Sequence, residues 1–154
     1  DATIARLSGA AGIDCVFSVP PFQEQQLEKA GIRTLLNSFD VLGPHSFTVC
    51  WANARFRQRN PVLYKALVAA LKEGTEVVNA DKAAAGKLWI EDSHSKLNPK
   101  MVEDIVSGPQ VTWTMTPLET MAFAKFMPDV GSVKNLPATW SDLFFPEVHG
   151  LSGS

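Results

Sequence analysis

The chain has 154 residues, of which 45% are hydrophobic and 19% charged, and this composition is typical of a globular protein rather than a disordered one. Its formal net charge of −2 gives no electrostatic indication of nucleic-acid binding. No run of about 18 apolar residues is present, which argues against a membrane-spanning helix. At this length we expect one domain or a large part of one, and the start at Asp1 rather than Met suggests a cleaved leader or a truncation.

The first distinct pattern follows the end of a helix that we expect over residues 1–11. Positions 13–17 are mostly apolar and β-prone, which predicts a short buried strand. Pro20 and Pro21 then stop the strand and suit the first turn of a helix, which we expect over residues 21–30. A strand that leads into a helix N-terminus places backbone N–H groups where α/β sheets bind ligands, so this joint, called the elbow below, is a candidate binding site.

Two further strands are expected at residues 32–37 and 46–52, with a loop over residues 38–46 between them. The 46–52 run is almost continuously apolar and β-prone, so we expect neighbouring elements to cover both of its faces. Cys15 and Cys50 lie in strand-like runs, which favours buried free thiols, while a disulfide between them stays open. Neither the cysteines nor the histidines have the spacing of a metal site, and no cofactor is predicted.

Most of the chain after residue 53 is predicted to be helical. Asn60 and Pro61 match an N-cap and a first helical residue, and they open the longest helix, which carries an apolar stripe and ends at residues 79–81. Shorter helices are expected at residues 54–59, at residues 82–92, between the Asn-Pro pair at 98–99 and the Gly-Pro pair at 108–109, between Pro117 and Gly131, and as a last turn after Thr139.

Several of these helices carry specific start and packing signals. The Thr-Pro-Leu-Glu sequence at 116–119 matches a capping box with proline at the first helical position. Residues 149–154 are expected to form a loose tail. The side chains expected to be buried by the two central short helices are Ala84, Leu88, Trp89, Met101, Val102, Ile105 and Val106.

The sequence predicts an α/β fold, because a few short strands are followed by a long, mostly helical stretch. The sheet of this fold would be incomplete, with few short strands and many helices. Because such a sheet is thin for the amount of helix, we expect further strands upstream of Asp1.

Several short motifs also occur in a particular order and spacing. They are Gly-Ile-Asp at 12–14, Pro-Pro-Phe at 20–22, Leu-Asn-Ser-Phe-Asp-Val-Leu-Gly at 36–43, Cys-Trp-Ala at 50–52, Phe56 before Asn-Pro at 60–61, Val-Gly-Ser-Val-Lys at 130–134 and Trp-Ser-Asp-Leu-Phe-Phe at 140–145. With these motifs the chain resembles the C-terminal half of the nitrate/sulfonate/taurine-type substrate-binding proteins of ABC transporters. That family has the type II periplasmic-binding-protein fold, and its members are longer than this chain.

The resemblance implies two α/β lobes joined by crossing strands. Residues 1–45 would form the end of the second lobe and the hinge crossover, and residues 46–154 the C-terminal part of the first lobe with a helical tail. The implied function is that of a non-catalytic solute-binding component of an ABC importer, which closes its lobes around a small organic anion such as a sulfonate in the interlobe cleft. Such a protein is periplasmic, or extracytoplasmic and lipid-anchored, and its partners are the small-molecule ligand and the ABC permease in the membrane.

The candidate ligand-binding residues come from the elbow and from one loop histidine. They are Phe17, Ser18, Pro20, Pro21, Phe22, Gln23 and His45. Phe22 would supply a flat apolar wall, Ser18 a hydroxyl and Gln23 an amide. The two prolines donate no N–H, so the elbow is a weaker anion site than a glycine-rich turn. No catalytic residue and no metal ligand is predicted.

Two other interpretations stay open. One is an enzyme on the same fold, because the pyrimidine-precursor synthases of thiamine metabolism look similar, and a cleavable signal peptide upstream would separate the receptor from the enzyme. The other is self-association, in which an apolar face that the missing strands would cover pairs with a second copy of the chain.

Overall fold

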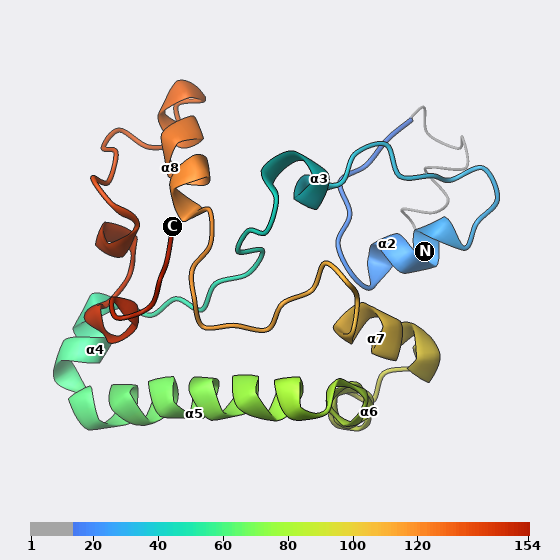
Figure 1. The fold of residues 1–154 in the computed structure, drawn as a ribbon, viewed down its shortest axis with the longest axis horizontal. Coiled ribbons are helices and arrows are strands. Elements are labelled where there is room, and N and C mark those ends of the chain that lie inside the picture. Colours follow the sequence, from blue (N-terminus) through green and yellow to red (C-terminus); the bar gives the residue numbers. More distant parts are fainter. Residues whose placement is uncertain (1–13) are drawn as a thin grey trace. The chain divides into compact units, whose positions relative to one another are not determined.

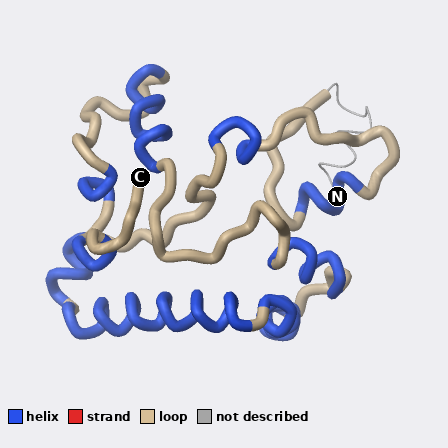
Figure 2. The backbone as a smooth tube through the Cα atoms, in the orientation of Figure 1, coloured by secondary structure: helices blue, strands red, loops and turns tan. Residues whose placement is uncertain are grey.

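The structure, a computed structural model, describes residues 14–154, and over this range the chain consists of helices and irregular segments without a strand (Figure 2). The predicted α/β fold is therefore wrong, and the helix expected over residues 1–11 lies outside the described residues. By its internal contacts the chain divides into two units. The first unit contains Asp1–Asn37 and Lys82–Val111, and the second contains Ser38–Asp81 and Thr112–Ser154.

The three predicted strands are irregular segments wherever the structure describes them. Residues 14–17, 32–37 and 46–52 are β-prone in sequence, yet none of them is part of a strand in the described chain. A strand exists only through hydrogen bonds to a neighbouring strand, so β propensity without a partner leaves irregular backbone. This missing pairing is the physical reason why the predicted sheet is wrong.

Two helices form the packed part of the first unit. α6 (Lys82–Ser93) lies against α7 (Pro99–Val106), and Val102, which is only 4% exposed, packs on Gly86 (Figure 1). A Cβ atom at Gly86 would lie 3.4 Å from Val102 Cγ1, an ordinary van der Waals distance, so α6 and α7 are in close contact at this glycine. The burial predicted for Val102 is confirmed, whereas the side chains predicted to be buried on α6 are exposed: Ala84, Leu88 and Trp89.

The second unit contains α3 (Ser38–Leu42), α4 (Ala54–Arg59), α5 (Pro61–Ala80) and α8 (Thr120–Asp129), followed by the 3₁₀ turns η2 (Trp140–Leu143) and η3 (Pro146–Val148) (Figure 1). α4 and α5 lie where the sequence predicts them, whereas α3 occupies a segment that was predicted to be a loop. None of the 20 residues of α5 is buried, so its predicted apolar stripe is at most partly covered in the described chain.

The two Asn-Pro pairs start their helices in different ways. At α7 the side-chain oxygen of Asn98 accepts a hydrogen bond of 2.8 Å from the amide of Lys100, which confirms the predicted N-cap. At α5, Pro61 is the first helical residue as predicted, but the side chain of Asn60 donates to the carbonyl of Phe56 at 3.0 Å and does not cap. Identical dipeptides therefore differ because α4 ends directly before α5.

α8 starts later than the sequence predicts. The capping box at 116–119 does not form, because the amide of Leu118 donates to Oγ of Ser46 at 2.9 Å and the Leu118 carbonyl accepts from the Ser46 amide at the same distance. Glu119 adopts a left-handed conformation with φ of 52°, and the helix begins at Thr120. Hydrogen bonds to a distant part of the chain thus replace the local capping signal.

The C-terminal residue, Ser154, is fixed by hydrogen bonds to the segment before α8 and to its first residue. The amide of Ser154 donates to the carbonyl of Pro117 at 3.0 Å, and its own carbonyl accepts from the amide of Thr120 at 2.7 Å. Its hydroxyl accepts from the amide of Glu119 at 2.9 Å. These bonds give partners to backbone groups around the N-terminus of α8, and the prediction of a loose tail over residues 149–154 is wrong for its last residue.

Few side chains are buried in the part of the chain that the structure describes. Among its hydrophobic residues only Val102 and Ala124 are buried. Cys15 and Cys50 are both exposed free thiols, so their predicted burial is wrong. The reason is the same for both, because the sheet that was expected to cover them is not formed.

Candidate functional site

The second unit contains a groove of about 890 Å³, a volume within the usual range of small-molecule sites. Residues 45–52 form one part of its lining, and residues of α5, of the start of α8 and of the 143–148 segment form the rest. Six of the lining residues carry aromatic rings, and we call this site the aromatic groove: Phe47, Trp51, Tyr64, Phe123, Phe144 and Phe145. Aliphatic side chains such as Leu67 and Leu71 also belong to the lining.

His45 is a polar side chain of the aromatic groove whose orientation is fixed by two contacts. Its Nδ1 lies 2.8 Å from the carbonyl oxygen of Gly43, and because a carbonyl only accepts, Nδ1 carries the proton. Its ring also packs against Phe123, with the ring centroids 5.9 Å apart. Nε2 forms no hydrogen bond to the described residues and is left for a ligand in the groove.

Glu147, which lines the aromatic groove, forms an ion pair with Arg57, which is not part of the lining. Arg57 of α4 contacts Glu147 of η3, with Nη2 and Oε1 2.8 Å apart and a second bond of 2.9 Å from Nε. The guanidinium also lies over the rings of Phe145 and Tyr64, at 5.3 and 5.8 Å from their centroids. This arginine is therefore already occupied by protein groups.

The contacts within this cluster shift three pKa values. The hydrogen bond from Arg57 lowers the pKa of Glu147 and raises that of Arg57 itself. Burial is the largest cause of the raised pKa of Tyr64. At neutral pH the two charges cancel and the tyrosine is neutral, so this part of the groove offers a ligand aromatic surface and no net charge.

The elbow belongs to the first unit and has a different character. Its helix, α2 (Phe22–Leu27), begins directly after a cis Pro20–Pro21 bond. The amides of Phe22 and Gln23 both donate to the carbonyl of Val19, at 2.9 and 3.2 Å. These first N–H groups of the helix, which the sequence offered to an anion, are thus already used within the chain.

The other elbow side chains do not converge on one point. Phe17 is fully exposed, Phe22 is half exposed, and Ser18 lies between them in sequence with its side chain partly covered. The amide nitrogen of Gln23 donates to the carboxylate of Glu24 at 2.8 Å. None of the six predicted elbow residues lines the aromatic groove, and of the seven predicted site residues only His45 does so.

Sequence reasoning missed the aromatic residues of the groove. It placed Phe123 in the helix between Pro117 and Gly131, Trp51 in a covered strand, and Phe144 and Phe145 at the end of the 140–145 motif. The rings are spread from position 47 to position 145, so no local spacing could group them. The only feature of the sequence that could have indicated the groove was the number of aromatic residues that follow the candidate residue His45.

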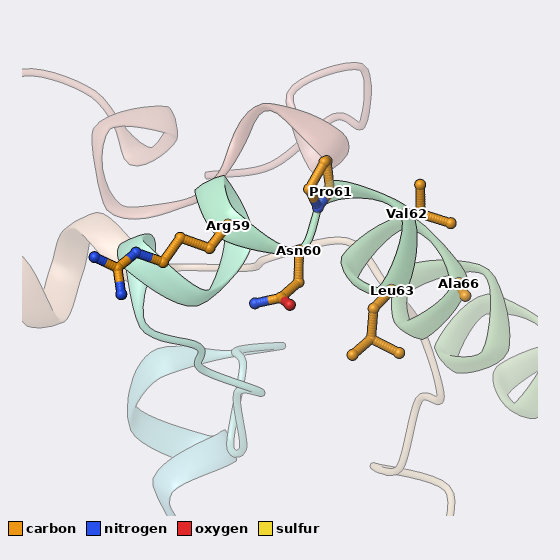
Figure 3. Close-up of a pocket in the computed structure, with 6 residues that line it drawn as sticks. All are labelled: Arg59, Asn60, Pro61, Val62, Leu63 and Ala66. Carbon is orange, nitrogen blue, oxygen red and sulfur yellow. The ribbon is translucent and has the colours of Figure 1, made fainter.

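A second, shallower hollow lies where α4 meets α5 (Figure 3). Its side chains do not point toward a common centre, because Arg59 extends away from Val62 and Leu63. No polar atoms converge there, so this hollow is a poorer candidate than the aromatic groove.

Within residues 14–154 no three His, Cys, Asp or Glu side chains come together in a way that could hold a metal ion. No helix of the described part combines the length and the apolarity needed to cross a membrane. In comparisons with protein-family models, with curated proteins and with solved structures, none matches this chain. A functional proposal therefore depends on the geometry of the aromatic groove and on the sequence resemblance.

Proposed function

We propose that the chain binds a small organic anion with an apolar body, such as a sulfonate, in the aromatic groove, and that it does so as the non-catalytic solute-binding component of an ABC importer. The observation that carries this proposal is the position of His45 against the ring of Phe123, with Nδ1 held by Gly43 and Nε2 without a hydrogen-bond partner among residues 14–154. The importer role rests on the sequence resemblance.

The chemistry of the groove favours a ligand with two different ends. Aromatic and aliphatic side chains form most of the lining, so the body of the ligand should be apolar. Arg57 is neutralised by Glu147, which leaves His45 as the group best placed to meet an acidic head. A charged head on an apolar body satisfies both parts of this lining at once.

The proposed binding mechanism differs from the lobe closure that the sequence resemblance implies. Closure of two lobes about hinge strands is not part of it, because the described chain contains no strand. The partner it requires is the ABC permease, and the site of action is the periplasm or the outer face of the membrane. Ligand binding by the elbow residues, on a surface separate from the groove, stays a prediction.

Calorimetric titration with benzenesulfonate tests the binding step, with benzyl alcohol as a neutral probe of similar size. We expect benzenesulfonate to bind more tightly, and His45→Ala to weaken its binding about tenfold, near the lower limit for a hydrogen bond to a charged group. Binding of benzyl alcohol should be unchanged by the same substitution. His94→Asn is the matched control, because His94 lies in the first unit and asparagine tolerates its left-handed φ of 51°.

Equal affinity for both probes, or an affinity for benzenesulfonate that is the same in wild type and in His45→Ala, would discard the proposal.

A further inference from the structure

The 47–51 segment (Phe-Thr-Val-Cys-Trp) is the most exposed apolar stretch of the second unit that also has free backbone groups. None of its N–H or carbonyl groups forms a hydrogen bond to another described residue. It contains neither a turn nor a bend, and Phe47, Val49 and Trp51 are 63%, 58% and 85% exposed. A β-prone segment with unpaired backbone and exposed side chains is a template for pairing with another strand.

The sequence of this segment is nearly symmetric about its central residue. When two copies pair antiparallel with Val49 opposite Val49, Phe47 of each copy faces Trp51 of the other, and Thr48 faces Cys50. Aromatic pairs directly across two strands are among the favourable ones, and each occurs twice in this arrangement. An antiparallel pair about a two-fold axis is also closed, because both copies use the same surface.

We propose that the 47–51 segment is a self-association site, at which two copies of this chain pair as antiparallel strands centred on Val49. The side chains of this segment also line the aromatic groove, but the inference does not rest on the proposed function, because the pairing uses the backbone of residues 47–51 and requires no ligand.

Charge permits this pairing. Residues 46–54 contain no charged side chain, and the whole chain has a net charge of only −2. Two copies therefore meet without like charges directly opposite each other and with little general repulsion.

The area available indicates a weak dimer. An aromatic side chain covers about 150–250 Å² when fully buried, so the exposed parts of Phe47 and Trp51 in two copies offer roughly 450–750 Å². Val49 and neighbouring groove residues add to this, which brings the total toward the low end of about 1,200 Å² for specific interfaces. We therefore expect a dimer that forms reversibly and depends on concentration.

Sedimentation velocity over about 1–200 μM protein tests self-association, because a reversible dimer must follow mass action. Wild type should shift from monomer to dimer, whereas Val49→Lys and Val49→Pro should stay monomeric, the lysine by repulsion across the axis and the proline by removing an N–H. Val62→Lys is the matched control, since it changes an exposed valine outside the aromatic groove by the same charge and should dimerise like wild type. Far-UV circular dichroism confirms that each variant keeps its helices.

Disulfide trapping tests the register in a background without Cys15 and Cys50. Directly opposed residues of antiparallel strands have Cα atoms about 4.5–5.5 Å apart, within the range that a disulfide spans. Val49→Cys should therefore cross-link at least ten times faster than Trp51→Cys, because only position 49 meets its own copy.

A chain that stays monomeric at every concentration overturns the proposal, and so does cross-linking at equal rates at positions 49 and 51. A monomer that instead binds an added extended apolar peptide through the same segment overturns it in favour of a strand from a different protein.

Discussion

Gly86 is the position at which the packing of the first unit can be tested most directly. It lies inside α6 with its Cα against α7, and a Cβ there would meet Cγ1 of Val102 at 3.4 Å and Cγ2 of Val106 at 3.8 Å. These are ordinary van der Waals distances for one added carbon. Gly74, inside α5, is its matched counterpart, because a Cβ there meets nothing within 4 Å.

The two glycines should respond alike to alanine and differently to valine. Alanine favours the helix over glycine by about 1 kcal/mol at an exposed position, so both Gly86→Ala and Gly74→Ala should stabilise their helices by about 0.5–1 kcal/mol. Valine adds two further carbons, which at position 86 enter the space held by Val102. Gly86→Val should therefore be about 1–3 kcal/mol less stable than Gly74→Val, the usual cost of overpacking.

Urea unfolding followed by far-UV circular dichroism measures the free energy of unfolding, and hydrogen exchange of the α5 and α6 amides assigns each effect to its helix. The four variants differ only in the site and in the size of the added group, so general effects of glycine replacement cancel in the comparison. If Gly86→Val and Gly74→Val were equally stable, Gly86 would not lie against Val102 and the description of the α6–α7 contact would be incorrect.

Two further predictions concern a helix start and an ion pair. Asn98→Ala should destabilise α7 by about 1 kcal/mol through loss of its N-cap, whereas Asn60→Ala should cost less than half of that because Asn60 does not cap α5, and urea unfolding of the two variants checks the difference. Arg57 holds the pKa of Glu147 below its ordinary value of 4.5, so the pair stabilises the second unit above that pH and loses its effect as the pH falls through the lower folded value. The stability difference between wild type and Glu147→Gln should therefore shrink as the pH falls from about 6 to about 3, and a difference that is constant with pH would contradict this role.

The sequence was sufficient for those elements whose signals are local. α4 and α5 begin where the sequence predicts, and α7 has its predicted cap, because an asparagine, a proline and a helical repeat act within a few residues of one another. His45, a candidate from the loop before the 46–52 run, lines the aromatic groove, and its contact with a ligand stays a prediction.

The sheet and the groove could not be read in the same way, because both depend on residues that are distant in sequence. Residues 46–52 have the composition of a strand, but only a second strand in hydrogen-bonding distance makes a sheet, and the described chain supplies none. The capping box at 116–119 does not form, because amides of this segment donate to the hydroxyls of Ser46 and Ser154. The first amides of the elbow helix donate to the carbonyl of Val19. The rings of the aromatic groove are brought together from positions 47 to 145 by tertiary structure alone. Local signals therefore determined the positions of α4, α5 and α7, whereas contacts between residues distant in sequence decided where α8 begins and what the segments between the helices form.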